Sequence, residues 1–237
     1  MLTGLQRKLR MAPDTYERHR LIAELVGDPT DLLDVGGIKG ELGLFLPDTG
    51  ITTINMSGED ADTHFDGDEL PFGDHEFEVA VSLDVLEHIP HDQRALHFSE
   101  LARVARRKVI ICCPLGSSEH VEAERELSAW FRDTTGQNHR FLNEHLETGL
   151  PGEDELNRLA QATGHPHRLR FHGDFREANL AFMASTRLRT ARTPRSLVEY
   201  ARIRLNPRRS LVLDENSSDH SNRAFVELEI TPSQANA

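Results

Sequence analysis

The chain has 237 residues, of which 38% are hydrophobic and 28% are charged, a composition typical of a globular protein and a length that suits one domain with a sizeable core. The net charge of −12 argues against sequence-independent binding to a nucleic-acid backbone. No apolar run approaches the roughly 20 residues of a membrane-spanning helix. The basic residues near the start are followed by no apolar stretch of the kind found in secretory signals. We therefore expect a cytoplasmic protein with no nucleic-acid partner.

Hydrophobic periodicity predicts helices and strands that alternate along the chain. Helices are predicted over 16–26, from about residue 90 onward, and over 118–163 with breaks near Gly136 and at Pro151-Gly152. Strands are predicted at 31–35, 51–56, 77–83, 108–113, 168–172 and 223–230. Such alternation is typical of an α/β fold with a doubly wound, mostly parallel sheet that has helices on both faces.

We expect one domain over residues 1–230, followed by a disordered tail over 231–237. Within the domain, 114–166 is predicted to be a helical insertion that caps a substrate, and 175–215 a helical, arginine-rich segment. In doubly wound sheets a ligand binds outside the carboxyl ends of the strands, where the strand order reverses. The functional residues are therefore expected directly after the strands.

Glycines follow the first predicted strand. Asp34 lies at the end of this strand, and Gly36, Gly37 and Gly40 come after it. Glycines let the backbone turn sharply and approach a ligand closely, although such a turn also serves strand-to-helix packing. The spacing fails the G-x-G-x-x-G pattern of dinucleotide binding, because the position of the middle glycine holds Ile38.

Polar residues also follow the next two strands. Asn55 ends the second strand, at a position from which a side chain can bond a ribose hydroxyl. Asp66 and Gly67 offer a carboxylate beside an unobstructed backbone N–H, which suits an adenine edge. Three further polar residues follow the third strand: Asp84, Glu87 and His88. Taken singly, each of these features is equally a turn residue, a solvated acidic turn or a helix cap.

In their order and spacing, these motifs closely resemble those of the class I S-adenosylmethionine-dependent methyltransferases, in the methyltransferase-11/23-like branch. The residues that carry the resemblance are Asp34-Val35-Gly36 with Gly40, Asp66-Gly67 with Leu70-Pro71-Phe72 and Phe77-Glu78, and Leu86-Glu87-His88-Ile89. The resemblance covers roughly residues 16–115. It implies a Rossmann-like methyltransferase fold with seven strands and a helical insertion between strands 5 and 6, and S-adenosylmethionine as the cofactor.

The resemblance also implies roles for particular residues. The residues assigned to cofactor binding are Asp34, Gly36, Gly37, Gly40, Asn55, Asp66, Gly67 and Asp84. The implied reaction is in-line transfer of a methyl group to a small-molecule, sugar or lipid-linked acceptor, with His88 as the candidate general base. In the insertion, the candidate acceptor-binding residues are His139, Arg140 and His145, because His139 and Arg140 suit an anionic group.

Two other function classes remain open. Ile38, Asn55 and Glu78 depart from the family pattern, and the first two lie in the predicted cofactor pocket. These departures leave room for a catalytically silent protein of the same fold that serves as a regulatory or partner subunit. A nicotinamide oxidoreductase on a similar sheet is the third class, and the failed glycine spacing disfavours it.

No pattern in the sequence predicts a metal site. The thirteen histidines occur without a C-x-x-C or H-E-x-x-H spacing, so no metal is expected. The two cysteines, Cys112 and Cys113, are adjacent and point to opposite faces of a predicted strand. We interpret them as small buried hydrophobic residues.

Positive charge gathers in one segment, from Arg187 to Arg209, which holds eight arginines and a single acid, Glu199. Leu197, Ala201 and Leu205 recur in it at helical spacing, which predicts an amphipathic helix. Such a helix can lie against a phosphate-bearing substrate or an anionic membrane surface. It can also be a solvated face that pairs with the acidic remainder of the chain, and this interpretation is slightly favoured.

Overall fold

The computed structural model describes residues 4–56, 60–67, 69–204 and 211–231. The predicted disordered tail therefore lies outside the described residues except for Thr231, as do Leu205, Arg208 and Arg209. The strands are β1 (Asp31–Val35), β2 (Gly50–Asn55), β3 (Thr63–His64), β4 (Phe77–Leu83), β5 (Ala105–Pro114), β6 (His167–Asp174) and β7 (Ser221–Glu229).

Helices precede, separate and follow these strands. They are α1 (Gly4–Arg10), α2 (Pro13–Val26), α3 (Arg94–Val104), α4 (Ser118–Thr135), α5 (Arg140–Thr148), α6 (Glu153–Ala162), α7 (Phe175–Ala191) and α8 (Pro194–Arg204), with short 3-10 helices η1 (Leu42–Leu44) and η2 (Leu86–His88). Among the described helices, none combines the length and the apolar character that crossing a membrane requires.

The described strands form one seven-stranded sheet in the order β3-β2-β1-β4-β5-β7-β6. Strands β1 to β5 pair in parallel, whereas β7 is antiparallel to both β5 and β6. The predicted doubly wound, mostly parallel sheet is therefore confirmed. The strand order reverses at β1, which has β2 on one side and β4 on the other. This topology places the expected ligand crevice at the carboxyl ends of β1 and β4.

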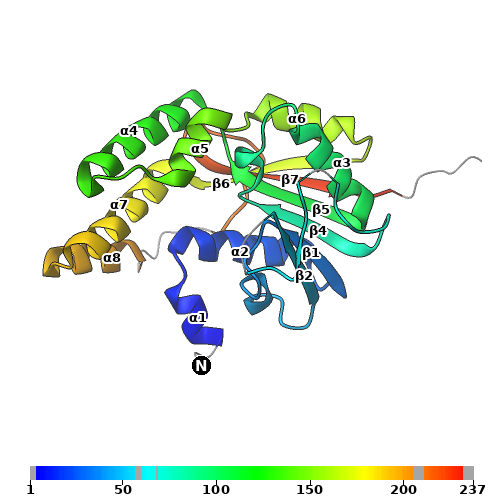
Figure 1. The fold of residues 1–237 in the computed structure, drawn as a ribbon, viewed down its shortest axis with the longest axis horizontal. Coiled ribbons are helices and arrows are strands. Elements are labelled where there is room, and N and C mark those ends of the chain that lie inside the picture. Colours follow the sequence, from blue (N-terminus) through cyan, green and yellow to red (C-terminus); the bar gives the residue numbers. More distant parts are fainter. Residues whose placement is uncertain (1–3, 57–59, 68, 205–210, 232–237) are drawn as a thin grey trace, which may run out of the picture.

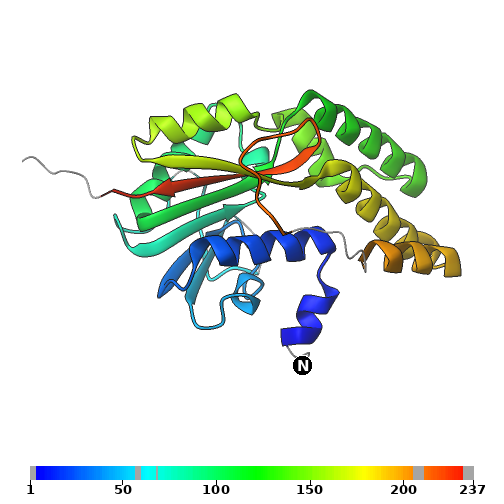
Figure 2. The ribbon, with the colours of Figure 1, turned by 180° about the vertical axis from the view of Figure 1, so that it is seen from behind.

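Hydrophobic cores cover both faces of the sheet. Helix α2 packs on one face and helices α3 and α6 on the other, as Figures 1 and 2 show. Neighbouring strand residues contribute to opposite cores, as the strand period of two requires: Leu32 belongs to one and Leu33 to the other. Cys112 and Cys113 follow the same rule, and both are free and fully buried. They are the small buried residues that the sequence predicted.

Two helical segments extend beyond the sheet. Helices α4, α5 and α6 lie between β5 and β6, and helices α7 and α8 lie between β6 and β7. Figure 1 shows α4, α5, α7 and α8 gathered at one end of the molecule. The first break in the helical run falls at Gly136, which ends α4 in the left-handed conformation that glycine favours. The second falls at Pro151-Gly152, directly before α6.

A fully buried arginine ties these added helices to the body of the fold. The Arg94 side chain, on α3, is 0% exposed. Its Nε donates to the carbonyl oxygen of Ile89 at 3.0 Å, and its Nη2 donates to the carbonyl oxygens of Thr148 and Gly149 at the end of α5. Its Nη1 lies 2.9 Å from Oε1 of Glu155 on α6. One side chain therefore connects the segment after β4 to the ends of two helices.

Removing this connection should destabilise the fold. Arg94→Met keeps most of the aliphatic volume but removes the cationic partner of Glu155 and the donor of the backbone carbonyls. We expect the free energy of unfolding to fall by about 3 kcal/mol, because breaking a buried pair leaves an uncompensated charge. Urea denaturation measures this. The control is Arg125→Met, which breaks an exposed pair with Glu122 on α4 and should change the value by less than about 0.5 kcal/mol. Equal effects of the two variants would contradict the role given to Arg94.

Candidate functional site

A cavity of about 960 Å³ opens at the carboxyl edge of the sheet. Its lining includes the turn after β1, the end of β2, the segment at 65–67, the end of β4 with η2, and parts of α2, α5 and α7. The three segments predicted to surround the cofactor therefore face one cavity, represented by Gly36, Asn55 and Gly67. Ile38 lines the cavity with 50% of its surface exposed, so it leaves the space open.

Most of the predicted site residues line this cavity. They are Asp34, Gly36, Gly37, Asn55, Asp66, Gly67, Asp84, His88, Arg140 and His145. Gly40 and His139 are also described, but they stand outside the lining. These residues therefore share one cavity, and the role of each of them stays a prediction.

The turn after β1 has no room for side chains at two positions. Gly36 has a φ of 80°, and a Cβ atom there would lie 2.2 Å from Cγ2 of Val85. A Cβ atom on Gly37 would lie 2.0 Å from Oδ2 of Asp34. Both distances are far shorter than any real carbon contact, so only glycine fits the conformation and the approach. The backbone of the turn is thereby left bare toward the cavity.

Asp34 is a buried carboxyl directly beneath this turn. Its side chain is 2% exposed, and Oδ1 has no hydrogen-bond partner among the described residues. Burial raises the pKa of Asp34 to about 7, with Arg18 opposing the shift and Glu41 adding to it. Near neutral pH the carboxyl therefore exchanges its proton, and it can either donate or accept a hydrogen bond in the cavity.

Asn55 supports the glycine turn from the neighbouring strand. Its Nδ2 donates to the carbonyl oxygen of Gly37 at 2.9 Å. An aspartate, which the resemblance leads one to expect here, has no hydrogen to donate to this carbonyl. The amide oxygen of the same side chain remains suited to accept a bond from a ligand hydroxyl. The departure from the family pattern thus has a structural use.

Asp84 is engaged by two arginines that the sequence analysis did not select. It follows β4 with a φ of 53°, and its carboxylate oxygens pair with Arg18 of α2 and Arg223 of β7. The Arg223 side chain is 9% exposed and also lies 3.5 Å from Oδ2 of Asp14. Asp84 was predicted to bind the cofactor, and that role stays a prediction. Its observed contacts are with the two arginines, whose side chains it holds in the cavity wall.

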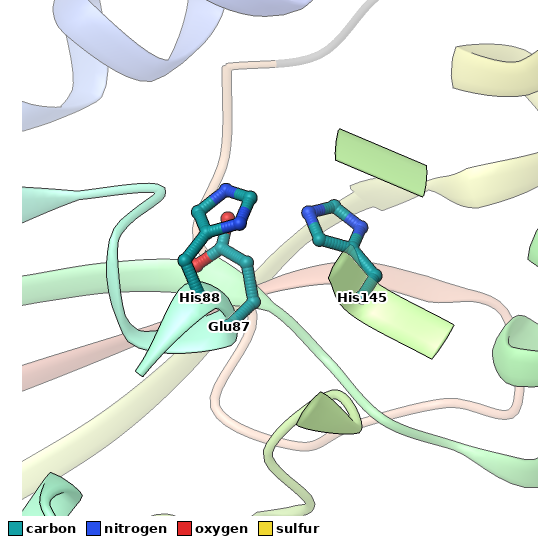
Figure 3. Close-up of side chains that lie close together, drawn as sticks. All are labelled: Glu87, His88 and His145. Carbon is teal, nitrogen blue, oxygen red and sulfur yellow. The ribbon is translucent and has the colours of Figure 1, made fainter. Parts of the chain in front are cut away.

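The side of the cavity nearest α5 holds a cluster of acids and histidines. Glu87 and His88 come from η2 and His145 from α5, and Figure 3 shows the two imidazole rings across a narrow gap. The ring centroids are 4.9 Å apart. Burial lowers the pKa of His88, whereas the Glu124 carboxylate raises the pKa of His145 against the opposing effect of burial. Sequence spacing gave no sign of this cluster, because its members come from separate elements.

Among the described residues, one group of side chains has the spacing to hold a metal ion. It consists of Glu87, His88 and His145, whose ligand atoms lie within 4.8 Å of one another. The sequence predicted no metal. That prediction considered only ligand spacings within one helix or strand, whereas these three ligands come from η2 and α5.

The other residues predicted to bind the acceptor have structural contacts. His139 precedes α5 and accepts a bond from the backbone N–H of Leu142 at 3.4 Å, and its ring packs against Phe131 and Phe182. Arg140 is exposed and lies 2.6 Å from Oε1 of Glu144. Of these two, only Arg140 reaches the cavity, so it remains the candidate for binding an anionic acceptor.

The described part of the arginine-rich segment, 187–204, covers the end of α7 and all of α8. Arg187 pairs with Glu199 at 2.8 Å, and its guanidinium stands 5.4 Å from the ring centroid of Trp130. In the described part of the segment, 187–204, no residue lines the cavity. Both interpretations of its charge, as a solvated face or as a surface for anionic membranes, stay predictions.

The raised pKa of Asp34 gives a testable pH dependence of stability. The native carboxyl holds its proton to about pH 7, whereas its ordinary pKa is 3.8. The folded state therefore binds more protons than the unfolded state between these values, and stability falls as the pH rises through them. Asp34→Asn removes this loss. From pH 5 to pH 8 the stability of the variant relative to the parent should rise by roughly 3 kcal/mol.

Chemical denaturation at several pH values measures this difference. Burying the new amide lowers the free energy of unfolding by an amount that does not depend on pH. The readout is therefore how the difference in unfolding free energy between variant and parent changes with pH. Asp48→Asn is the control, because Asp48 is exposed, and its difference curve should be flat. A flat curve for Asp34→Asn would mean that Asp34 ionises in the folded protein as readily as it does in the unfolded chain.

Comparisons with known proteins show which family model and which solved structures this chain resembles. Residues 42–113 match the family model of a methyltransferase domain. The fold is similar to that of a SAM-dependent methyltransferase from Archaeoglobus fulgidus, with a TM-score of 0.58, 12% identity, and coverage of 95% of this chain and 97% of the other. It is also similar to geranyl diphosphate methyltransferase in complex with SAM, with a TM-score of 0.51, 12% identity and 95% coverage of each chain.

A third similar structure is phosphoethanolamine N-methyltransferase 2 of Haemonchus contortus in complex with S-adenosyl-L-methionine. The TM-score is 0.53 and the identity 14%, and the match covers 90% of this chain and 52% of the other, so the chain spans about half the length of that enzyme. At such identities the likeness shows a shared fold. No curated protein matches the sequence significantly. The methyltransferase-domain match from η1 to β5, together with a fold shared along almost the whole chain, supports the class I S-adenosylmethionine-dependent methyltransferase that the motifs predicted.

Proposed function

We propose that this S-adenosylmethionine-dependent methyltransferase acts on a small-molecule, sugar or lipid-linked acceptor that enters the cavity beside α5. The observation that carries the proposal is the division of a single cavity. One side has the bare glycine turn, Asn55 and the 65–67 segment, and the other has η2 and α5. Ligand pockets generally measure about 300–1,000 Å³. A cavity of about 960 Å³ therefore has room for a cofactor and a small acceptor together.

The residues of the first side suit the three parts of the cofactor. The glycine turn lets the nucleoside approach the backbone of β1, and the amide oxygen of Asn55 can accept a bond from a ribose hydroxyl. Asp66 and the N–H of Gly67 suit the adenine edge. Arg18 lies in the same wall, where its Nη1 pairs with Asp84, and the rest of its guanidinium can donate to the carboxylate of the methionine part.

The chemistry needs mainly position and exclusion of water. A sulfonium methyl group is intrinsically reactive, so the protein contributes by holding the acceptor atom about 3–3.5 Å away and in line. Charge is neutralised along the reaction, and a dry cavity favours such a change. The buried apolar part of the lining, which includes Leu83 and Leu142, serves this purpose.

Cofactor binding is the first test. Isothermal titration calorimetry with S-adenosylmethionine should show one site per chain. Gly37→Ala should weaken binding by at least about tenfold, equal to 1.4 kcal/mol, because the added Cβ atom displaces Asp34 from beneath the turn. Gly43→Ala is the matched control, since a Cβ atom on Gly43 meets only Ile51 Cδ1 at 3.9 Å, and its affinity should match that of the parent.

The result also separates the proposal from its alternative. A parent chain that fails to bind S-adenosylmethionine at millimolar concentration would favour the catalytically silent protein. Equal loss of affinity in both glycine variants would point to general destabilisation and not to a specific turn.

Acceptor identity is the second test. The protein is incubated with a cell extract and cofactor that carries a deuterated methyl group, and the small molecules, sugars and lipids are analysed by mass spectrometry. We expect one compound class to gain the heavy methyl group. Arg140→Gln should reduce that product selectively if the acceptor is anionic, because Arg140 is a cationic residue in the lining on the α5 side. Heavy methyl found only in protein or nucleic acid would contradict the proposed acceptor class.

A further inference from the structure

We infer that Glu87, His88 and His145 form a binding site for a divalent transition-metal cation on the acceptor side of the cavity. Binding of the cation follows from these side chains alone, and only its role in catalysis rests on the proposed function. The site goes beyond the sequence motifs, which predicted cofactor contacts and a general base but no metal.

The geometry of the three residues is close to that of a metal site. Their ligand atoms lie within 4.8 Å of one another, and Figure 3 shows the carboxylate of Glu87 together with the two imidazole rings. Metal–ligand bonds of about 2.0–2.2 Å in a tetrahedral site place the ligand atoms about 3.3–3.6 Å from each other. Closing the site around an ion therefore takes a shift of about an ångström, which is within reach of side-chain rotation. All three residues also line the cavity.

A carboxylate supports one of the two imidazoles. Oε1 of Glu124 lies 3.0 Å from Nδ1 of His145, which leaves Nε2 of His145 for the cation. Metal-binding histidines generally have such a carboxylate partner, which fixes the ring orientation and strengthens the ligand. Oε2 of Glu144 lies 3.0 Å from Nδ1 of His88 without forming a hydrogen bond. The surroundings of His145 therefore match those of a metal-binding histidine.

Unpartnered buried oxygens give an independent reason to place a cation here. Glu87 is 1% exposed, and its Oε2 has no hydrogen-bond partner among the described residues. Oε2 of Glu124 is buried and unpartnered in the same way. A buried carboxylate without partners is costly. A cation between Glu87 and the two histidines would compensate that cost.

The ligand set favours particular metals. Two imidazoles and one carboxylate suit Mn²⁺, Fe²⁺, Co²⁺ or Zn²⁺, whereas Mg²⁺ and Ca²⁺ prefer oxygen ligands. Three protein ligands leave coordination positions open, as in catalytic sites. These positions face the cavity, so an acceptor hydroxyl can occupy one of them.

Such a cation would change how the acceptor is activated. A metal-bound hydroxyl loses its proton to water more readily because its pKa falls. The resulting oxygen then forms a bond to the methyl carbon while the carbon–sulfur bond breaks, and that electron pair passes to the sulfur. In this arrangement His88 is a ligand, and it does not act as the general base that the sequence predicted.

Titration with Co²⁺ tests the site directly. The protein is first dialysed against a chelator and then titrated with CoCl₂, without cofactor or acceptor. We expect one Co²⁺ per chain with visible absorption bands of nitrogen and oxygen coordination. His88→Gln, His145→Gln and Glu87→Gln should each weaken Co²⁺ binding by at least about tenfold. Glu124→Gln should weaken it by about 10- to 100-fold, the usual effect of losing a partner of a metal-bound histidine.

Two controls keep the result interpretable. His167→Gln changes an exposed histidine at the amino end of β6, away from the cavity, and should bind Co²⁺ as the parent does. Melting temperature and S-adenosylmethionine affinity, measured without metal, show that each variant is folded. His88→Gln is the safest of the substitutions, because the His88 side chain is 26% exposed.

Each outcome decides one question. A parent chain that takes up no stoichiometric Co²⁺, or ligand variants that bind it as tightly as His167→Gln does, would overturn the metal site. If the parent chain binds S-adenosylmethionine but no Co²⁺, the metal site is wrong and the proposed function stands. If it binds Co²⁺ but no S-adenosylmethionine, the metal site stands and the proposed function falls.

Discussion

Three arginines with little solvent exposure fix the site in place at the carboxyl edge of the sheet. Arg223 of β7 and Arg18 of α2 hold Asp84, two residues before η2, and Arg94 of α3 holds the carbonyl of Ile89 directly after it. The three residues of η2 are therefore clamped from both sides. Arg94 also bonds the end of α5, and the hydroxyl of Thr148 donates to the carbonyl of Glu87. The residues that face each other across the cavity are thus held by one network.

This network is better explained by positioning than by stability. A buried ion pair gains little over well-packed hydrophobic residues, because desolvation offsets most of its attraction. Asp84 is held in a left-handed conformation that a non-glycine residue adopts at some cost. Charges and strain of this kind concentrate at sites whose geometry matters for function. In the part of the chain that the structure describes, the apolar cores hold neither ion pairs nor left-handed non-glycine residues of this kind, whereas the edge that receives the ligand holds both.

Sequence reasoning reached the fold and the cofactor side of the cavity because both depend on local signals. Alternation of apolar segments predicted the strands, and glycines after a strand predicted the turn. Strand β3 has only two residues, too few for any periodicity. Arg18 looks like an ordinary charged residue of an amphipathic helix, and only the fold shows that its side chain reaches Asp84. The cluster of Glu87, His88 and His145 was invisible for a related reason, since histidine spacing identifies a metal site only when the ligands share one element.

The departures from the family pattern acquire a different meaning in three dimensions. In the sequence, Ile38 and Asn55 suggested a weakened or silent cofactor pocket. In the structure, Ile38 leaves the cavity open, and Asn55 uses its amide hydrogen to support the carbonyl of Gly37. A carboxylate at position 55 would face that carbonyl oxygen with no hydrogen between them, and the two would repel each other. The amide therefore belongs to this version of the turn, because its N–H holds the turn while its oxygen stays able to accept a bond from a ligand hydroxyl.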